Sequence, residues 1–159
     1  MMPNITAGDM MQSNLITLSP DMHVLDAIDL LLRHRISGAP VVDREDQFVG
    51  VFSEQSCMRL IIHSAVERGQ MGTLPLMTFV DANAAVVNVQ ADLLSIANTF
   101  VDDACRRLPV LDESGRLCGQ IYRGDLVRVV REHIRSLDAI PLGAAVYLTA
   151  IFDGGPGLL

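Results

Sequence analysis

The sequence predicts an α+β fold in which two βαββα units pack together about a pseudo-twofold axis. The main observation is an internal repeat: Pro40-Val41 and Pro109-Val110 lie 69 positions apart, and each pair is followed by an aspartate two residues after its valine. A shift of 69 positions also aligns residues 17–61 with 86–130 without a gap. Each unit has apolar residues to bury, and a second copy can cover the face that the first leaves exposed.

The first helix of each unit is predicted by apolar residues at the spacing i, i+3, i+4, i+7. The residues in this pattern are Val24, Ala27, Ile28 and Leu31 in the first copy, and Leu93, Ile96, Ala97 and Phe100 in the second. Ser19-Pro20 favours the start of the first helix, with serine as the N-cap and proline in the first turn.

A β-hairpin and a second helix are expected after each first helix, and a short strand before it. The hairpin strands are two apolar segments around a polar turn. They are predicted at 39–42 and 48–52, and again at 108–111 and 117–121. The leading strands are predicted at 15–18 and 85–87. The closing helices have their apolar positions at Cys57, Leu60 and Ile61, and at Leu126, Val129 and Val130.

These elements divide the chain into repeat 1 at 5–68, a connecting segment at 69–79, repeat 2 at 80–137 and a C-terminal tail at 138–159. The connection is marked by glycines and a proline between 66 and 75. Segments 5–11 and 74–78 are expected to enter their repeats in similar ways.

The composition excludes several classes of function. A net charge of −7 disfavours a nucleic-acid interface. The three cysteines and four histidines show no metal-ligand spacing, so we expect no metal site. The N-terminus does not resemble a signal peptide, and the uncharged stretch at 139–152 is too short to span a membrane, which favours a cytoplasmic protein. No nucleophile or phosphate-loop motif is present, so we expect no enzyme.

The motifs at 34–43, 49–54 and 106–110 resemble those of the cystathionine β-synthase (CBS) domain pair, also called a Bateman module. The resemblance covers about residues 5–137. It implies a regulatory module that requires no cofactor and binds AMP, ADP, ATP, S-adenosylmethionine or a related adenosyl ligand in two clefts between the repeats. In this family a Ser/Thr-x-x-Asp element from one repeat binds ribose through its aspartate, while the other repeat supplies backbone and basic side chains.

The resemblance implies two unequal clefts in this chain. The cleft ranked first retains the aspartate, Asp125, but has Tyr122 in place of Ser/Thr. Its other candidate residues are Arg123, Thr17, Arg35, Ile36, Ser37, Gly38 and Ala39. The second cleft has the hydroxyl, Ser53, but has Ser56 in place of the aspartate. Its other candidates are Val87, Cys105, Arg106, Arg107 and Leu108.

Structural alternatives remain for these residues. Asp125 also suits a cap on the last helix, and Tyr122 a packing role. The arginines after each first helix also suit the helix dipole, and Gly38 suits a turn. For the whole chain, the alternative to ligand binding is a structural or dimerisation module with degraded nucleotide sites. A homodimer is expected, with action on a protein partner in trans or through the assembly itself.

Overall fold

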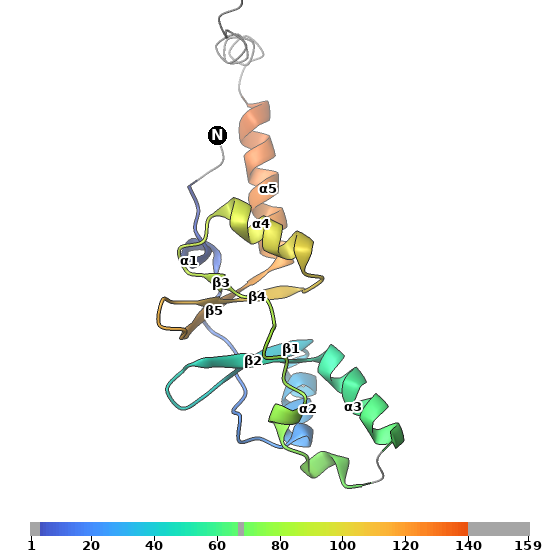
Figure 1. Cartoon of the computed structure of the whole chain (residues 1–159). Coiled ribbons are helices and arrows are strands. Elements are labelled where there is room, and N and C mark those ends of the chain that lie inside the picture. The colour runs from blue at the N-terminus through green and yellow to red at the C-terminus, as the bar shows by residue number, and fades with distance from the viewer. Residues whose placement is uncertain (1–3, 67–68, 140–159) are drawn as a thin grey trace, which may run out of the picture.

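The computed structural model describes residues 4–66 and 69–139, which form two α/β halves with their sheets at the centre and their helices outside (Figure 1). The first half contains α2 (Val24–His34), β1 (Gly38–Val42), β2 (Phe48–Ser53) and α3 (Glu54–Val66). The second contains β3 (Val87–Asn88), α4 (Leu93–Asp102), β4 (Arg107–Leu111), β5 (Leu117–Tyr122) and α5 (Arg123–Asp138). Three short helices complete the elements of the described residues: α1 (Ala7–Met10), η1 (Met71–Thr73) and η2 (Leu76–Thr78). The predicted α+β class and the two repeats are confirmed.

The two halves are equivalent in strand register. Pro40 of β1 lies opposite Val51, and Pro109 of β4 lies opposite Gln120, at the same relative positions in their hairpins. The hairpins also join each other through a matched pair of backbone hydrogen bonds. The Phe48 amide donates to the Gly115 carbonyl, and the Leu117 amide donates to the Asp46 carbonyl. Each donor and acceptor in one bond has its counterpart 69 positions away in the other, which is the pattern of a pseudo-twofold axis.

The leading strands differ between the halves. In the second half β3 pairs in parallel with β4, which gives the predicted three-stranded sheet. In the first half the predicted strand at 15–18 pairs with β1 only at Leu18, which lies opposite Val41, so the sheet proper has two strands.

The predicted start of the first helix is wrong. Helix α2 begins at Val24 with His23 as its N-cap, while Ser19 and Pro20 precede it in a turn. In this turn the Ser19 carbonyl accepts the Met22 amide. The Val24 amide donates to the Leu74 carbonyl, so the connecting segment supplies an acceptor at the start of the helix. The helix therefore starts where Leu74, distant in the sequence, accepts the first amide, and not at the local Ser-Pro pattern.

The segment that enters each repeat packs in the core of the other repeat. Ala7 of α1 is buried with the second-half core residues Val87 and Ile96. Leu76 of η2 is buried with Leu18 and Val24 of the first half. Ala7 and Leu76 are 69 positions apart, so the two segments enter in equivalent ways, as predicted, but each crosses to the opposite half.

The predicted faces of the first helices, α2 and α4, are buried or half-buried, whereas Ile61 of α3 and Val130 of α5, two apolar positions of the predicted closing helices, are exposed. Val24, Ala27 and Leu31 of α2 lie in the first core. Ile96 and Phe100 of α4 lie in the second. No helix within 4–66 or 69–139 is long and apolar enough to span a membrane. Beyond Ala139 the predicted tail lies outside the described residues.

Candidate functional site between the repeats

A cavity of about 460 Å³ opens between the two halves and is lined by both. This volume falls in the range of small-molecule sites, roughly 300–1,000 Å³. The first half contributes Ser37, Val51, Ser53, Glu54 and Gln55 to its wall. The second half contributes Asp81, Ala84, Ala85, Asp103, Ala104, Cys105, Arg106, Arg107 and Pro109. Ser53, Cys105, Arg106 and Arg107 of the predicted second cleft line this cavity, whereas Ser56, Val87 and Leu108 do not, and Ser37, predicted for the other cleft, does.

The cavity wall where β2 ends and α3 begins contains Ser53 but not Ser56. Ser53 lines the cavity, whereas Ser56 is fully buried and its hydroxyl accepts the Ser53 amide at 3.1 Å. The Glu54 amide donates to the Ser37 carbonyl at 2.9 Å and ties the start of α3 to the segment before β1. Ser56 thus satisfies a backbone donor at the helix start, and the site has no carboxylate at this position.

Arg107 joins the two halves at the cavity wall. Its guanidinium donates to the carbonyl oxygen of Gly38 and to the hydroxyl of Ser37. The guanidinium carbon also lies 5.8 Å from the centroid of the Tyr122 ring. Burial lowers the pKa of Arg107 from its ordinary value. A guanidinium remains charged at neutral pH, so Arg107 is a fixed cation in this wall.

The charges in the cavity wall are mixed. The cations are Arg106 and Arg107, and the anions are Glu54, Asp81 and Asp103. Among the anions, Glu54 and Asp103 are exposed and Asp81 is half-buried. Three carboxylates against two guanidinium groups make the wall slightly acidic, which disfavours a ligand with many phosphate charges.

Cys105 lies half-buried in the cavity wall. Desolvation by burial raises its pKa, and the nearby Asp103 carboxylate adds to this effect. The thiolate is the nucleophilic and metal-binding form of cysteine, so this environment suppresses both kinds of chemistry. Within the described part of the chain, no group of three or more His, Cys, Asp or Glu side chains is arranged to hold a metal ion.

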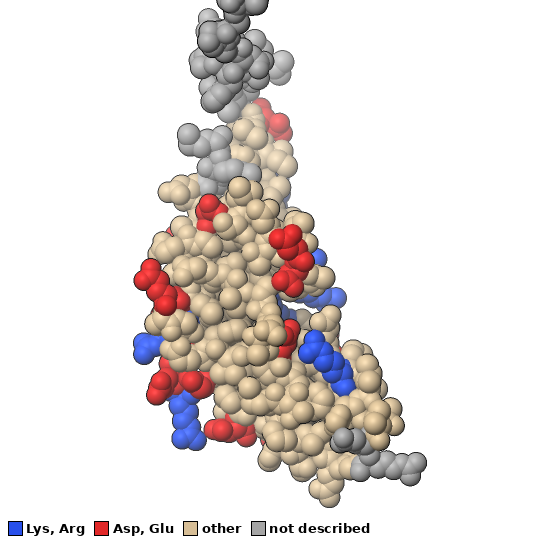
Figure 2. Space-filling view, in the orientation of Figure 1, with Lys and Arg blue, Asp and Glu red and all other residues tan. Residues whose placement is uncertain are grey.

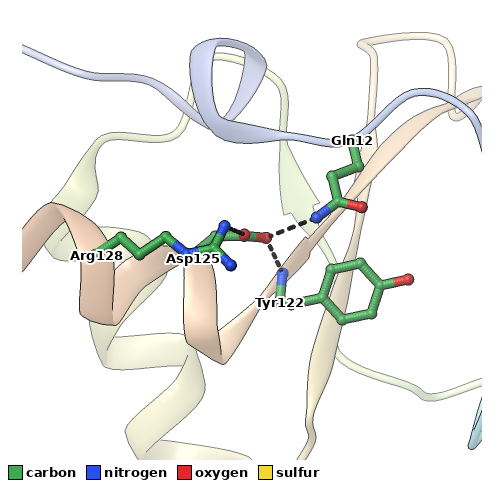
Figure 3. A network of polar contacts seen from close by, with 4 residues as sticks. All are labelled: Gln12, Tyr122, Asp125 and Arg128. Atoms are coloured by element: carbon green, nitrogen blue, oxygen red, sulfur yellow. Dashed lines mark hydrogen bonds and ion pairs between the residues drawn. The ribbon is translucent and has the colours of Figure 1, made fainter.

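Asp125 lies in the first turn of α5 and is engaged by protein groups (Figure 3). One carboxylate oxygen accepts the Tyr122 amide at 3.0 Å and the side-chain amide of Gln12 at 3.4 Å. The other lies 3.4 Å from the Arg128 guanidinium. The Tyr122 ring points away from this carboxylate (Figure 3). Asp125 therefore has the capping role that was its structural alternative, and its ribose role stays a prediction.

The other predicted residues are spread over the surface and the core. Thr17, Arg35 and Arg123 are exposed, whereas Ile36 is half-buried. Ala39 in β1, Val87 in β3 and Leu108 in β4 are buried core residues. Gly38 is also buried, in β1, where an added Cβ would lie 2.8 Å from the Ser53 Cβ. The glycine is thus required by the close approach of β2 and not by a turn.

Sequence reasoning missed several residues that line the cavity. Asp81 and Ala84 lie in a segment without strand or helix periodicity, Ala85 begins the predicted strand at 85–87, and Asp103 follows α4. The one signal for Asp81 is its distance of 69 positions from Gln12, a residue that contacts Asp125. This signal becomes informative only when the contacts of Gln12 are known.

Comparison with known proteins identifies relatives of similar architecture. CBSX1, a chloroplastic CBS domain-containing protein of Arabidopsis thaliana, is 29% identical over 84% of this chain and 67% of its own length. The solved structure of the CBS-pair protein CBSX2 from A. thaliana has a TM-score of 0.71 and 27% identity, covering 84% of this chain and 99% of that chain. A structure of CBSX2 in complex with AMP has a TM-score of 0.69 and 28% identity, covering 80% of this chain and 96% of that chain.

Other relatives are longer than this chain. The chain spans between 43% and 67% of the first curated relatives that it matches. The inosine-5'-monophosphate dehydrogenase of Halalkalibacterium halodurans is 28% identical over 89% of this chain, but the match covers only 28% of that enzyme. A family model described as the CBS domain matches twice, at residues 7–63 and 77–132. The two matches agree with the two halves of the fold, and the chain therefore belongs to the CBS domain family.

Proposed function

We propose that this chain is a regulatory module that binds an adenine nucleotide or a related adenosyl ligand in the cavity between its repeats. The observation that carries the proposal is the cavity of about 460 Å³, to which both repeats contribute. A ligand there contacts both halves at once, so its binding affects their relative arrangement. The complex of CBSX2 with AMP, at 28% identity, supports an adenosyl ligand.

The wall of the cavity suits the parts of such a ligand. Ala84, Ala85 and Ala104 are small and leave room for a flat base. Arg106 and Arg107 are suitable donors to one phosphate. The excess of carboxylates favours AMP or the cationic S-adenosylmethionine over ATP. The Asp125 cleft, ranked first from the sequence, remains a second candidate.

Thermal unfolding with added ligand tests the proposal. AMP at about one hundred times its dissociation constant is expected to raise the Tm by roughly 5–10 °C, because a ligand that binds only the folded state stabilises it by about 2.7 kcal/mol. ADP, ATP, S-adenosylmethionine and NAD are compared in the same screen. Arg106→Ala is expected to reduce the AMP shift, whereas Arg44→Ala leaves it unchanged because Arg44 pairs with Asp21, away from the cavity wall. No shift with any of these ligands in the parent would contradict the proposal.

A dimerisation module is the second candidate function, and the exposed apolar residues of the helices favour it. These residues occur as pairs 69 positions apart. The pairs are Leu25 and Leu94, Leu32 and Val101, Met58 and Val127, and Ile61 and Val130. All are exposed large side chains, and each pair places the same kind of surface on both halves. We propose that a second copy of the chain covers these helix faces and that a ligand acts through this dimer or on a protein partner.

A further inference from the structure

The position of Asp81 is equivalent to that of Gln12 in the other half. Gln12 exchanges two backbone hydrogen bonds with Gln120, at 2.8 and 3.0 Å. Asp81 exchanges two backbone hydrogen bonds with Val51, at 2.9 and 3.1 Å. Val51 and Gln120 are themselves equivalent, since they lie opposite Pro40 and Pro109. Gln12 and Asp81 therefore hold the same place beside their respective hairpins.

A carboxylate is found on each side of the pseudo-twofold axis, but at exchanged positions. On one side the first turn of α5 carries Asp125, and the neighbouring β-bridge position carries Gln12. On the other side the first turn of α3 carries Ser56, and the neighbouring β-bridge position carries Asp81. The acid that the Ser53 cleft lacks at position 56 is thus present in the same cleft at position 81.

The two carboxylates differ in what they can still bind. Both oxygens of Asp125 have protein donors within 3.4 Å. One oxygen of Asp81 accepts the Asn83 amide at 3.0 Å, and the other has no hydrogen bond or ion pair among the described residues. Asp81 also lines the cavity. A carboxylate with open acceptor sites is suited to the two hydroxyls of a vicinal diol.

The backbone holds Asp81 firmly at the cavity wall. Gly50 of β2 makes this possible, because an added Cβ there would lie 2.6 Å from the Asp81 carbonyl oxygen. The backbone amide of Asn83 also holds the Asp81 side chain, by donating to one of its carboxylate oxygens. Glu54 and Asp103, the other carboxylates of the wall, are exposed. Asp81 is therefore the best positioned of the three to act on a ligand.

We propose that Asp81 binds the ribose diol of the adenosyl ligand in the Ser53 cavity and replaces the carboxylate that is absent at Ser56. This inference rests on the proposed function, because it assigns a role within the same ligand site. Arg106 and Arg107 then bind the phosphate, and Asp81 selects a ligand with both ribose hydroxyls.

Calorimetry with AMP and 2′-deoxy-AMP tests this role in the full chain. Asp81→Asn is expected to weaken AMP binding about ten- to a hundredfold, because the hydrogen bonds from the ribose hydroxyls to a charged carboxylate are lost. The same substitution is expected to change 2′-deoxy-AMP binding much less, since that ligand lacks one of the two hydroxyls. Asparagine keeps an acceptor for the Asn83 amide, so the unliganded Tm should match that of the parent. Asp29→Asn, at an exposed residue of α2 outside the cavity wall, is the matched control and should leave AMP binding unchanged, while Asp125→Asn reports on the other cleft.

The outcomes separate this inference from the function on which it rests. Equal AMP affinity in the parent and in Asp81→Asn overturns the role of Asp81 while leaving adenylate binding intact. A loss confined to Asp125→Asn also overturns it and assigns the ligand to the other cleft. A parent chain that binds neither nucleotide overturns this inference, and it overturns the proposed function as well when ADP, ATP, S-adenosylmethionine and NAD also fail to raise the Tm.

Discussion

Ser56 and Asp125 perform the same backbone task with different chemistry. Each side chain accepts the amide three residues before it, at 3.1 Å for Ser56 and 3.0 Å for Asp125. The serine hydroxyl is neutral and suits full burial, whereas the aspartate is charged and is further stabilised by Gln12 and Arg128. Position 56 therefore lacks the charge that Asp125 carries at the equivalent position of the second repeat, but it keeps the hydrogen bond at the start of the helix.

Ser56→Ala is expected to lower the free energy of unfolding by about 1–2 kcal/mol, because it leaves the half-buried Ser53 amide at the helix start without its acceptor. Urea denaturation of the parent and the variant measures this difference. Ser64→Ala is the control, since Ser64 is exposed and its hydroxyl bonds only to the carbonyl of its own helix. Its effect should stay within about 0.5 kcal/mol. An unchanged midpoint for Ser56→Ala would show that the hydroxyl does not stabilise α3.

The candidate site was only partly predictable at the residue level. The resemblance placed Ser53, Cys105, Arg106 and Arg107 together, and all four line the cavity. It gave no indication of Asp81, because the segment before β3 has no periodic pattern and its place is fixed by bonds to β2. The engagement of the Asp125 carboxylate likewise depends on Gln12, which lies more than 100 residues away in the sequence.

At the scale of elements, the faces of the first helices were predictable, and the crossing of each entry segment to the opposite half was not. Apolar residues at helical spacing fixed the buried sides of α2 and α4, because this periodicity is local. The start of α2 depends on the Leu74 carbonyl, and the first core depends on Leu76. Both residues belong to the connection between the repeats. Contacts of this range leave no local signal in the sequence.

Leu76→Ala tests the crossing of the entry segment. Leu76 is fully buried in the core of the first half, although it follows that half in the sequence. Its truncation is expected to lower the free energy of unfolding by about 2–5 kcal/mol, the usual cost of a cavity in a packed core. Met77→Ala is the neighbouring control, because Met77 is 39% exposed. Urea denaturation compares the two, and equal small effects would contradict a core role for η2.

At the scale of the whole molecule, the repeat predicted the pseudo-symmetry and the structure extends it to the surface. Equivalent apolar residues are exposed on α2 and α4 and on α3 and α5. Charged side chains on the face shown in Figure 2 are scattered among broad uncharged areas. Apolar residues that recur at matched positions on both halves suit a self-complementary contact, in which one patch meets its copy on a second chain.

The proposed homodimer is expected to form through the exposed faces of α3 and α5. Met58 and Ile61 of α3 and their counterparts Val127 and Val130 of α5 are about half exposed or more in the single chain. Light scattering at micromolar concentration should give about twice the chain mass of 17.3 kDa. The double variant Ile61→Glu, Val130→Glu should give the single mass, because it places unpaired charges in an apolar contact. Met77→Glu, a charge added at an exposed residue outside these helices, should leave the dimer intact. A parent chain of single mass, or a double variant that remains dimeric, would show that these helix faces do not form the contact.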